Sequence, residues 1–133
     1  MEKYIDLLKS NKIKVTPQRL AIVELMDIHG HISVRDIFAK IQANFPSLSL
    51  ATVYKNINAM VENSFIKELK IVGQDAKYEL IKEEHSHMIC TQCGKVDDIQ
   101  LETSDLVSDA TKISRYNIDE SNIQFFGICP DCK

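Results

Sequence analysis

The sequence predicts an α+β protein: an N-terminal winged helix-turn-helix, then a small α/β domain with a zinc site made of four cysteines. Three observations predict this class: helical periodicity before residue 65, a hairpin pattern over residues 65–81, and two C-x-x-C pairs further on. Charge divides the chain at the same place, since residues 1–82 carry a net +3 and residues 83–133 carry −6. We therefore predict two domains, 1–82 and 83–133.

Composition restricts the class of protein. The 133 residues are 44% hydrophobic and 26% charged, which is ordinary for a globular chain and excludes wholesale disorder. Apolar runs fall short of the roughly 18–20 residues that a membrane helix needs, and the N-terminus lacks the apolar core of a signal peptide. We expect a cytoplasmic protein without a membrane partner.

The first helices are predicted by their apolar spacing and by one strong start signal. Apolar side chains within residues 4–8 predict a short first helix with frayed ends. Thr16 and Pro17 then begin a helix that runs to about Ile28, because threonine accepts from the first N–H groups and proline suits the first helical position.

Two further helices and a hairpin complete the predicted first domain. Ser33 with Asp36 resembles a capping pair, and the helix that Ser33 begins should stop before Pro46. Ser49 begins the next helix, over residues 50–63. Short strand-like runs on either side of a glycine-containing turn at 73–75 predict a β-hairpin, and this order of elements outlines a winged helix-turn-helix.

The second domain is predicted to hold three strands and one helix. The strands fall at residues 85–91, 96–101 and 122–129. Thr103 or Ser104 is expected to cap a helix that ends near Ile113. The apolar residues of this helix are expected to form a buried stripe, made of Leu106, Val107, Ala110 and Ile113.

All four cysteines lie in the acidic second domain, as two matched pairs: Cys90, Cys93, Cys129 and Cys132. Each C-x-x-C turn can direct two thiolates at one ion, and two such turns complete a tetrahedral zinc shell with no open position for catalysis. Two alternatives are disulfides, which a cytosolic chain disfavours, and a thioredoxin-like motif, which lacks its expected helix. We predict a structural Zn²⁺.

A histidine and carboxylate cluster precedes the first cysteine pair. On a strand, His85 and His87 point to one face about 6.6 Å apart, a workable bite for one cation, and Asp98 lies on the following strand. Each residue also has a simpler interpretation: a polar strand face for the two histidines, a solvated loop for His31 and a surface charge for Glu79.

Several motifs occur together in an order that resembles the ferric uptake regulator family of bacterial metal-dependent repressors. They are Thr16-Pro17-Gln18-Arg19, Ser49-Leu50-Ala51-Thr52-Val53-Tyr54, His85-x-His87-x-x-Cys90-x-x-Cys93-Gly94-Lys95 and Cys129-x-x-Cys132. The resemblance covers residues from about 12 to the C-terminus. It implies a C-terminal dimerisation domain, a homodimer and binding to an inverted-repeat double-stranded DNA operator.

The resemblance also implies a regulatory metal site at His31, Glu79, His85, His87 and Asp98. Three imidazoles and two carboxylates suit Fe²⁺ or Mn²⁺ and can also take Zn²⁺. Such an ion would set the angle between the two domains, and so between the two DNA-binding domains of the dimer.

The branch of the family is indicated by single positions. Asp98 resembles the peroxide-sensing branch, in which iron at this site reacts with peroxide and His31 and His85 would be oxidised. Glu79 instead resembles the iron sensors, so repression of metal-uptake genes in response to iron, manganese or zinc is the alternative. The further metal site of many iron sensors looks degraded here, with Glu84, Ser86 and Ser121 at its positions.

The helix over residues 50–63 is the candidate recognition element for the major groove. The residues expected at DNA are Lys14, Arg19, Thr52, Tyr54, Lys55 and Asn56, with Asn58 nearby. Tyr54 is the strongest candidate for contact with a base or a thymine methyl group. Arg19 is expected at the DNA backbone and Lys14 in the minor groove, and an asparagine can bond adenine through both its amide oxygen and its amide nitrogen. The simpler interpretation is the solvated face of an amphipathic helix.

Two other classes of function remain open. The first is an enzyme, either a thiol oxidoreductase or a metal hydrolase. The sequence contains no HExxH, Ser/His/Asp or phosphate-binding glycine pattern, so we expect no enzyme. A zinc-stabilised interaction module without DNA binding is the other class, and a gel shift with an AT-rich palindrome would separate it from a repressor.

Overall fold

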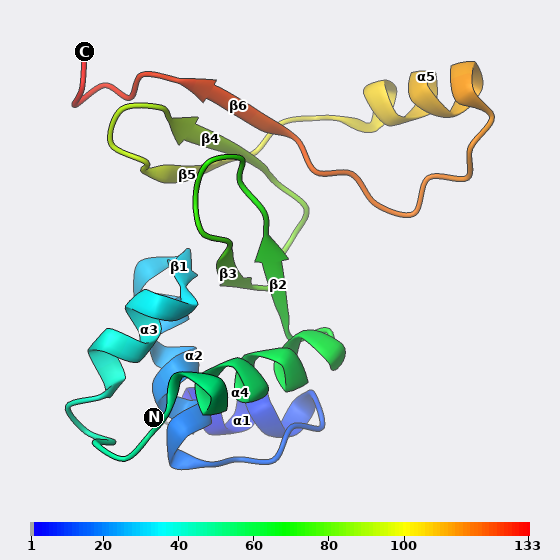
Figure 1. The fold of residues 1–133 in the computed structure, drawn as a ribbon. Coiled ribbons are helices and arrows are strands. Elements are labelled where there is room, and N and C mark those ends of the chain that lie inside the picture. Colours follow the sequence, from blue (N-terminus) through cyan, green and yellow to red (C-terminus); the bar gives the residue numbers. More distant parts are fainter. Residues whose placement is uncertain (1) are drawn as a thin grey trace. The chain divides into compact units, whose positions relative to one another are not determined.

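The computed structural model describes residues 2–133. The chain forms two compact units, Met1–Lys82 and Glu83–Lys133. Each unit has its own three-stranded sheet (Figure 1), and each is described by itself below.

Four helices make up most of the first unit: α1 Glu2–Ser10, α2 Pro17–His29, α3 Val34–Ile41 and α4 Leu50–Glu62. The predicted caps are confirmed, because Thr16, Ser33 and Ser49 each accept from the backbone N–H three residues on. Helix α3 is shorter than predicted: it ends at Ile41 and turns follow, well before Pro46.

A small sheet follows α4 and completes the winged helix, as the fold class predicted. Strands β2 Ile66–Leu69 and β3 Lys77–Leu80 pair antiparallel as the expected hairpin. A third strand, β1 Ile32–Ser33, pairs with the other edge of β3, so the order is β1-β3-β2. The sequence did not predict β1, because two residues are too short to show an alternating pattern.

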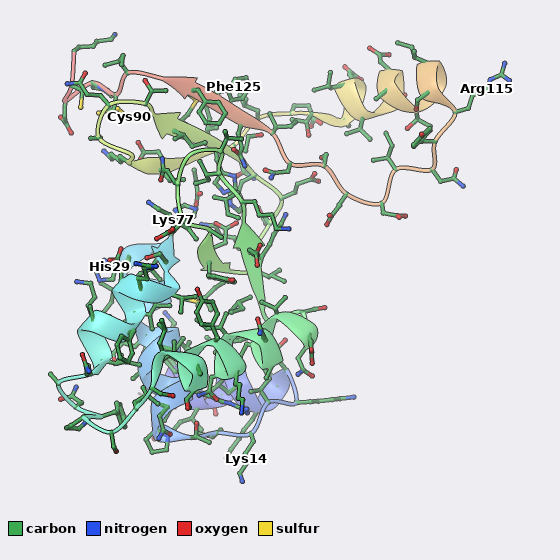
Figure 2. The ribbon with its side chains drawn as sticks, viewed as in Figure 1. Lys14, His29, Lys77, Cys90, Arg115 and Phe125 are labelled. Atoms are coloured by element: carbon green, nitrogen blue, oxygen red, sulfur yellow. The ribbon has the colours of Figure 1, made fainter. Side chains whose placement is uncertain are left out.

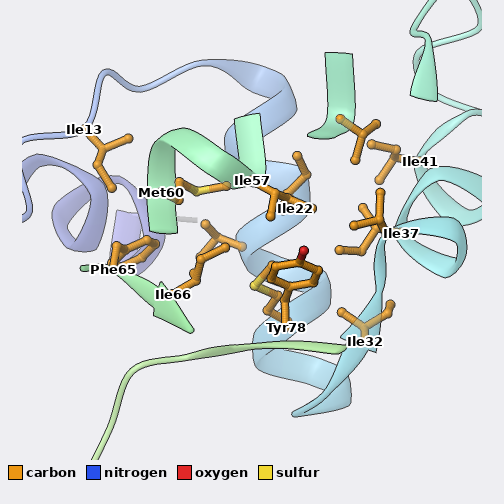
Figure 3. Packing of buried hydrophobic residues seen from close by; sticks show 14 of the residues in the cluster. Ile13, Ile22, Ile32, Ile37, Ile41, Ile57, Met60, Phe65, Ile66 and Tyr78 are labelled. Carbon is orange, nitrogen blue, oxygen red and sulfur yellow. The ribbon is translucent and has the colours of Figure 1, made fainter. Parts of the chain in front are cut away.

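The core of this unit lies where the helices meet the hairpin. Figure 3 shows Ile22, Ile37, Ile57 and Met60 converging from three helices towards Tyr78 on β3. Leu8 of α1 is fully buried, so the first helix is anchored at that point. Packing against this core therefore fixes one face of α4 and leaves the opposite face exposed.

Replacing Ser49 with alanine should lower the free energy of unfolding by about 1 kcal/mol, since the side chain caps α4. Its Oγ accepts from the N–H of Thr52 at 3.2 Å and lies 2.9 Å from the Thr52 hydroxyl. Urea unfolding followed by circular dichroism measures the change. The same substitution at Ser47, an exposed turn residue, is the matched control, and equal losses at both positions would contradict the capping role.

The second unit contains the strands β4 Ser86–Cys90, β5 Val96–Ile99 and β6 Gln124–Gly127, and the helix α5 Ser104–Ser114. Strand β4 is central, antiparallel to β5 and parallel to β6. A parallel pair needs a long crossover, and α5 with its flanking loops supplies it between β5 and β6.

The predicted buried stripe of α5 is wrong for the single chain. This helix has no buried residue: Leu106 is 59% exposed and Ile113 is 86% exposed. Figure 1 shows α5 extending away from the sheet of its own unit, so no strand of that sheet covers its apolar side. Thr103 occupies the N-cap position without a side-chain cap bond, and Glu102 instead accepts from the N–H of Ser104 at 2.9 Å.

Candidate metal centres and nucleic-acid interface

The four cysteines meet at one end of the second sheet. Cys90 ends β4, Cys93 follows in the turn to β5, and Cys129 and Cys132 lie after β6, which runs beside β4. Their sulfur atoms all lie within 4.8 Å of one another, and Figure 2 shows sulfur gathered at the labelled Cys90. The parallel pairing of β4 and β6 therefore joins two pairs that 35 residues separate in the chain.

The donor set fits zinc. Tetrahedral Zn–S bonds of about 2.3 Å place sulfur atoms ~3.8 Å apart, and Sγ of Cys93 lies 3.8 Å from Sγ of Cys129. The backbone N–H groups of Cys93 and Cys129 each donate to Sγ of Cys90 at 3.4 Å, the arrangement that supports a thiolate ligand.

Hydrogen bonds within the cluster shift the pKa values of two of the thiols in opposite directions. The N–H groups of Cys93 and Cys129 lower the pKa of Cys90 to about 6, because they stabilise the thiolate. Hydrogen bonding with Cys129 and burial raise the pKa of Cys132 to about 12. A bound Zn²⁺ would displace the remaining protons, since metal ligation requires thiolates.

One imidazole and one carboxylate meet within the first unit. Nε2 of His31 lies 2.7 Å from Oε2 of Glu79, and both side chains are buried. The unpredicted strand β1 explains the contact: Ile32 pairs with Tyr78 and Ser33 with Lys77, so the same register sets His31 opposite Glu79. The structure thus brings together two residues that the family resemblance, but no local sequence pattern, assigned to one site.

Two imidazoles and one carboxylate meet within the second unit. His87 on β4 pairs directly with Asp98 on β5, and its Nε2 lies 3.6 Å from Oδ1 of Asp98. Nε2 of His85 lies 3.3 Å from the same oxygen, and the two imidazole rings are 4.6 Å apart. The expected common face of His85 and His87 is confirmed.

The orientation of His85 suits a metal ligand. Its Nδ1 lies 2.8 Å from the backbone carbonyl of Glu83. A carbonyl only accepts, so Nδ1 carries a proton, and Nε2, which lies on the side of Asp98, is the ring nitrogen that could bind a metal. A backbone partner on the distal nitrogen is the usual support of a ligating histidine.

The three residues at the degraded metal site lie beside a cavity of about 630 Å³ within the second unit. Oγ of Ser121 donates to Glu84 at 3.1 Å, and Ser86 is buried. Hydroxyl groups are poorer ligands than imidazoles for a transition metal, so these residues form a hydrogen-bonded edge of the cavity rather than a clear metal site.

The residues expected at DNA gather around the exposed side of α4. Thr52, Tyr54 and Lys55 are exposed there, and Tyr54 is 42% exposed. Lys14, before α2, extends away from the helices of its unit (Figure 2). Arg19 and Asn56 are half-buried, and the Arg19 side chain donates a hydrogen bond to Asn56. No sequence pattern indicated this contact between α2 and α4.

Comparison with known proteins places these features in a family. A family model described as the ferric uptake regulator family matches residues 10–126. The chain belongs to this family.

Individual relatives include both iron and peroxide regulators. The peroxide-responsive repressor PerR of Staphylococcus saprophyticus is 30% identical, over 100% of this chain and 91% of its own. The solved structure of the Campylobacter jejuni peroxide stress regulator is 30% identical with a TM-score of 0.73, covering 96% of this chain and 98% of that one. The Helicobacter pylori ferric uptake regulator, described with three functional metal-binding sites, is 26% identical with a TM-score of 0.77, covering 98% and 89%.

Membership of the ferric uptake regulator family makes the chain a metal-dependent transcription regulator. Its cofactors are a structural zinc, which the four cysteines fit, and a regulatory divalent metal bound by histidine and carboxylate groups. Within residues 2–133, no helix is both long and apolar enough to cross a membrane.

Proposed function

We propose that this chain is a cytoplasmic, homodimeric repressor that binds an inverted-repeat DNA operator and releases it when peroxide oxidises a histidine at an iron site. The observation that carries the proposal is the pair of imidazole and carboxylate sets, His31 with Glu79 and His85 with His87 and Asp98. One set belongs to each unit, and both combine nitrogen and oxygen donors of the kind that Fe²⁺ and Mn²⁺ accept.

The proposed regulation follows from sharing one ion between the two units. A metal bound by all five side chains would favour one relative orientation of the units, because only that orientation satisfies every donor. In a dimer the same orientation would set the spacing of the two α4 helices for the half-sites of the operator. Loss of one donor would release the constraint.

The second unit exposes large apolar side chains that the proposed dimer could bury. Leu106, Ile113, Phe125 and Phe126 are all more than two-fifths exposed in the single chain. Apolar side chains in this number are the normal core of a subunit interface, and a second copy is the occupant that the family implies.

The proposed peroxide response depends on which metal is bound. Hydrogen peroxide would be the two-electron oxidant: one of its oxygen atoms would be added to a carbon of a ligand imidazole and the other would leave as water. An iron ion held by these residues would supply the redox chemistry that breaks the O–O bond. His31 and His85 are the proposed sites, because the resemblance to the peroxide-sensing branch points to these two histidines; Nε2 of each lies close to a carboxylate of its own donor set. An oxidised ring is a poorer donor, so the metal and then the operator would be released.

Peroxide treatment of the iron and manganese forms tests this proposal. Peptide mass spectrometry should find the added mass of one oxygen atom on His31 or His85 in the iron form alone, with loss of operator binding in fluorescence anisotropy. His29 is the internal control, because it is exposed and lies two residues from His31 yet belongs to neither donor set. An unmodified iron form that stays on the operator would contradict peroxide sensing.

Iron sensing is the second candidate, and the identity of Glu79 favours it. Glu79 is buried and lies 2.7 Å from His31, and a glutamate at this position resembles the iron sensors. In that case the iron form would bind the operator and remain bound and unmodified after peroxide treatment, whereas removal of iron by a chelator would release it.

A further inference from the structure

The guanidinium group of Arg19 joins two segments that carry the expected DNA contacts. Its Nε donates to Oδ1 of Asn56 on α4 at 3.0 Å, and its Nη1 donates to the backbone carbonyl of Lys14 at 3.1 Å. Arg19 itself is held at the start of α2, where its backbone N–H donates to Oγ1 of Thr16 at 3.2 Å. One side chain thus connects the segment before α2 with the recognition helix.

Both amide groups of Asn56 already have partners within the protein. Its Oδ1 accepts from Arg19, and its Nδ2 donates to the backbone carbonyl of Thr52 at 3.2 Å. An asparagine that recognises adenine needs its amide oxygen and nitrogen together. These two bonds fix the orientation of the Asn56 amide, with its oxygen towards Arg19, so the arrangement points to an anchor for Arg19.

We propose that Arg19 is a positioning residue that holds the Lys14 segment in register with the DNA-facing side of α4, through Asn56. The proposal rests on the proposed DNA-binding function and adds to it a role for Arg19 other than a phosphate contact. A planar guanidinium can donate in two fixed directions at once, to Asn56 and to Lys14, whereas a lysine ammonium lacks this geometry. A positive charge alone therefore does not replace the Arg19 guanidinium group.

Operator affinity separates positioning from charge. Arg19→Lys and Asn56→Ala should each weaken binding by about tenfold to a hundredfold, the range for a hydrogen bond to a charged group. The double variant should bind no more weakly than either single variant, because both remove the same link. Lys40→Ala, an exposed basic residue on α3, is the control for a lost charge and should bind as the wild type does.

The salt dependence of binding gives a readout that a phosphate contact would move. Arg19→Gln removes the charge, so its slope of log affinity against log salt should still equal that of the wild type if Arg19 only positions other residues, whereas a phosphate contact at Arg19 would lower the slope by about one, as Lys14→Ala should. Wild-type affinity in Arg19→Lys, or effects of Arg19→Lys and Asn56→Ala that multiply in the double variant, would overturn the positioning role.

A measurement on the free protein keeps this test separate from the proposed function. In ¹⁵N–¹H spectra the Arg19 Nε–H should exchange slowly in the wild type and rapidly in Asn56→Ala. A rapidly exchanging Nε–H in the wild type overturns the link itself. Failure of the wild type to bind DNA in any metal state, with this signal protected, would instead overturn the proposed repressor function.

Discussion

Replacing Cys93 with serine is expected to abolish zinc binding and the cooperative unfolding of residues 83–133. The apolar core of this unit is small: among its described hydrophobic residues, only Ile89 and Cys90 are buried. Its strands have four or five residues, and α5 adds no buried side chain. A structural zinc supplies roughly 10–16 kcal/mol of binding free energy in small domains, more than such a core supplies alone.

In protein whose regulatory site is loaded with Mn²⁺, atomic emission should find one zinc per chain in the wild type and none in Cys93→Ser, with loss of the thermal transition of the second unit. Gln92→Ala is the matched control, because Gln92 is exposed within the same C-x-x-C turn. Size exclusion should show the variant as a monomer or an aggregate if the exposed apolar surface forms the dimer. A variant that keeps its zinc and its transition would refute a four-cysteine site.

Local sequence signals predicted the first unit well because its helices depend on neighbouring residues. Thr16, Ser33 and Ser49 each cap a helix through the N–H three residues on, so a short motif contains the whole interaction. The end of α3 was predicted less well. Pro46 marks where a helix cannot continue, but the chain leaves the helix at Ile41 for turns that no single residue announces.

Local sequence patterns could not predict which strands pair across long distances in the chain. Strand β1 exists because Ile32 and Ser33 meet β3 more than forty residues later, and this pairing brings His31 to Glu79. The four cysteines were predicted to share an ion, yet the means of joining them, the parallel alignment of β4 with β6, is visible only in the structure. The buried stripe of α5 failed for a related reason. Periodicity predicts an apolar side on a helix, but not whether the same chain covers it.

Replacing His87 with alanine is expected to make operator binding independent of the regulatory metal. His87 is almost fully buried and lies across from Asp98, so its loss removes one donor and disturbs the position of a second. Metal-linked effects of this kind are typically about 5- to 150-fold in affinity, and Mn²⁺ should no longer produce one in the variant. Fluorescence anisotropy with a labelled palindromic operator, with and without Mn²⁺, measures the change. His29→Ala should keep the full metal response, and a response of normal size in His87→Ala would exclude this residue from the site.

The same measurement also decides whether the two donor sets act through one ion. If His31 and Glu79 share a metal with His85, His87 and Asp98, then Glu79→Ala should remove the metal response as completely as His87→Ala does. The double variant should then lose nothing more, because the second substitution acts on a site that is already broken. Two separate ions would instead give partial losses that add in the double variant. Only the shared ion couples the orientation of the two units to the concentration of metal, so non-additivity here is the quantitative signature of the proposed regulation.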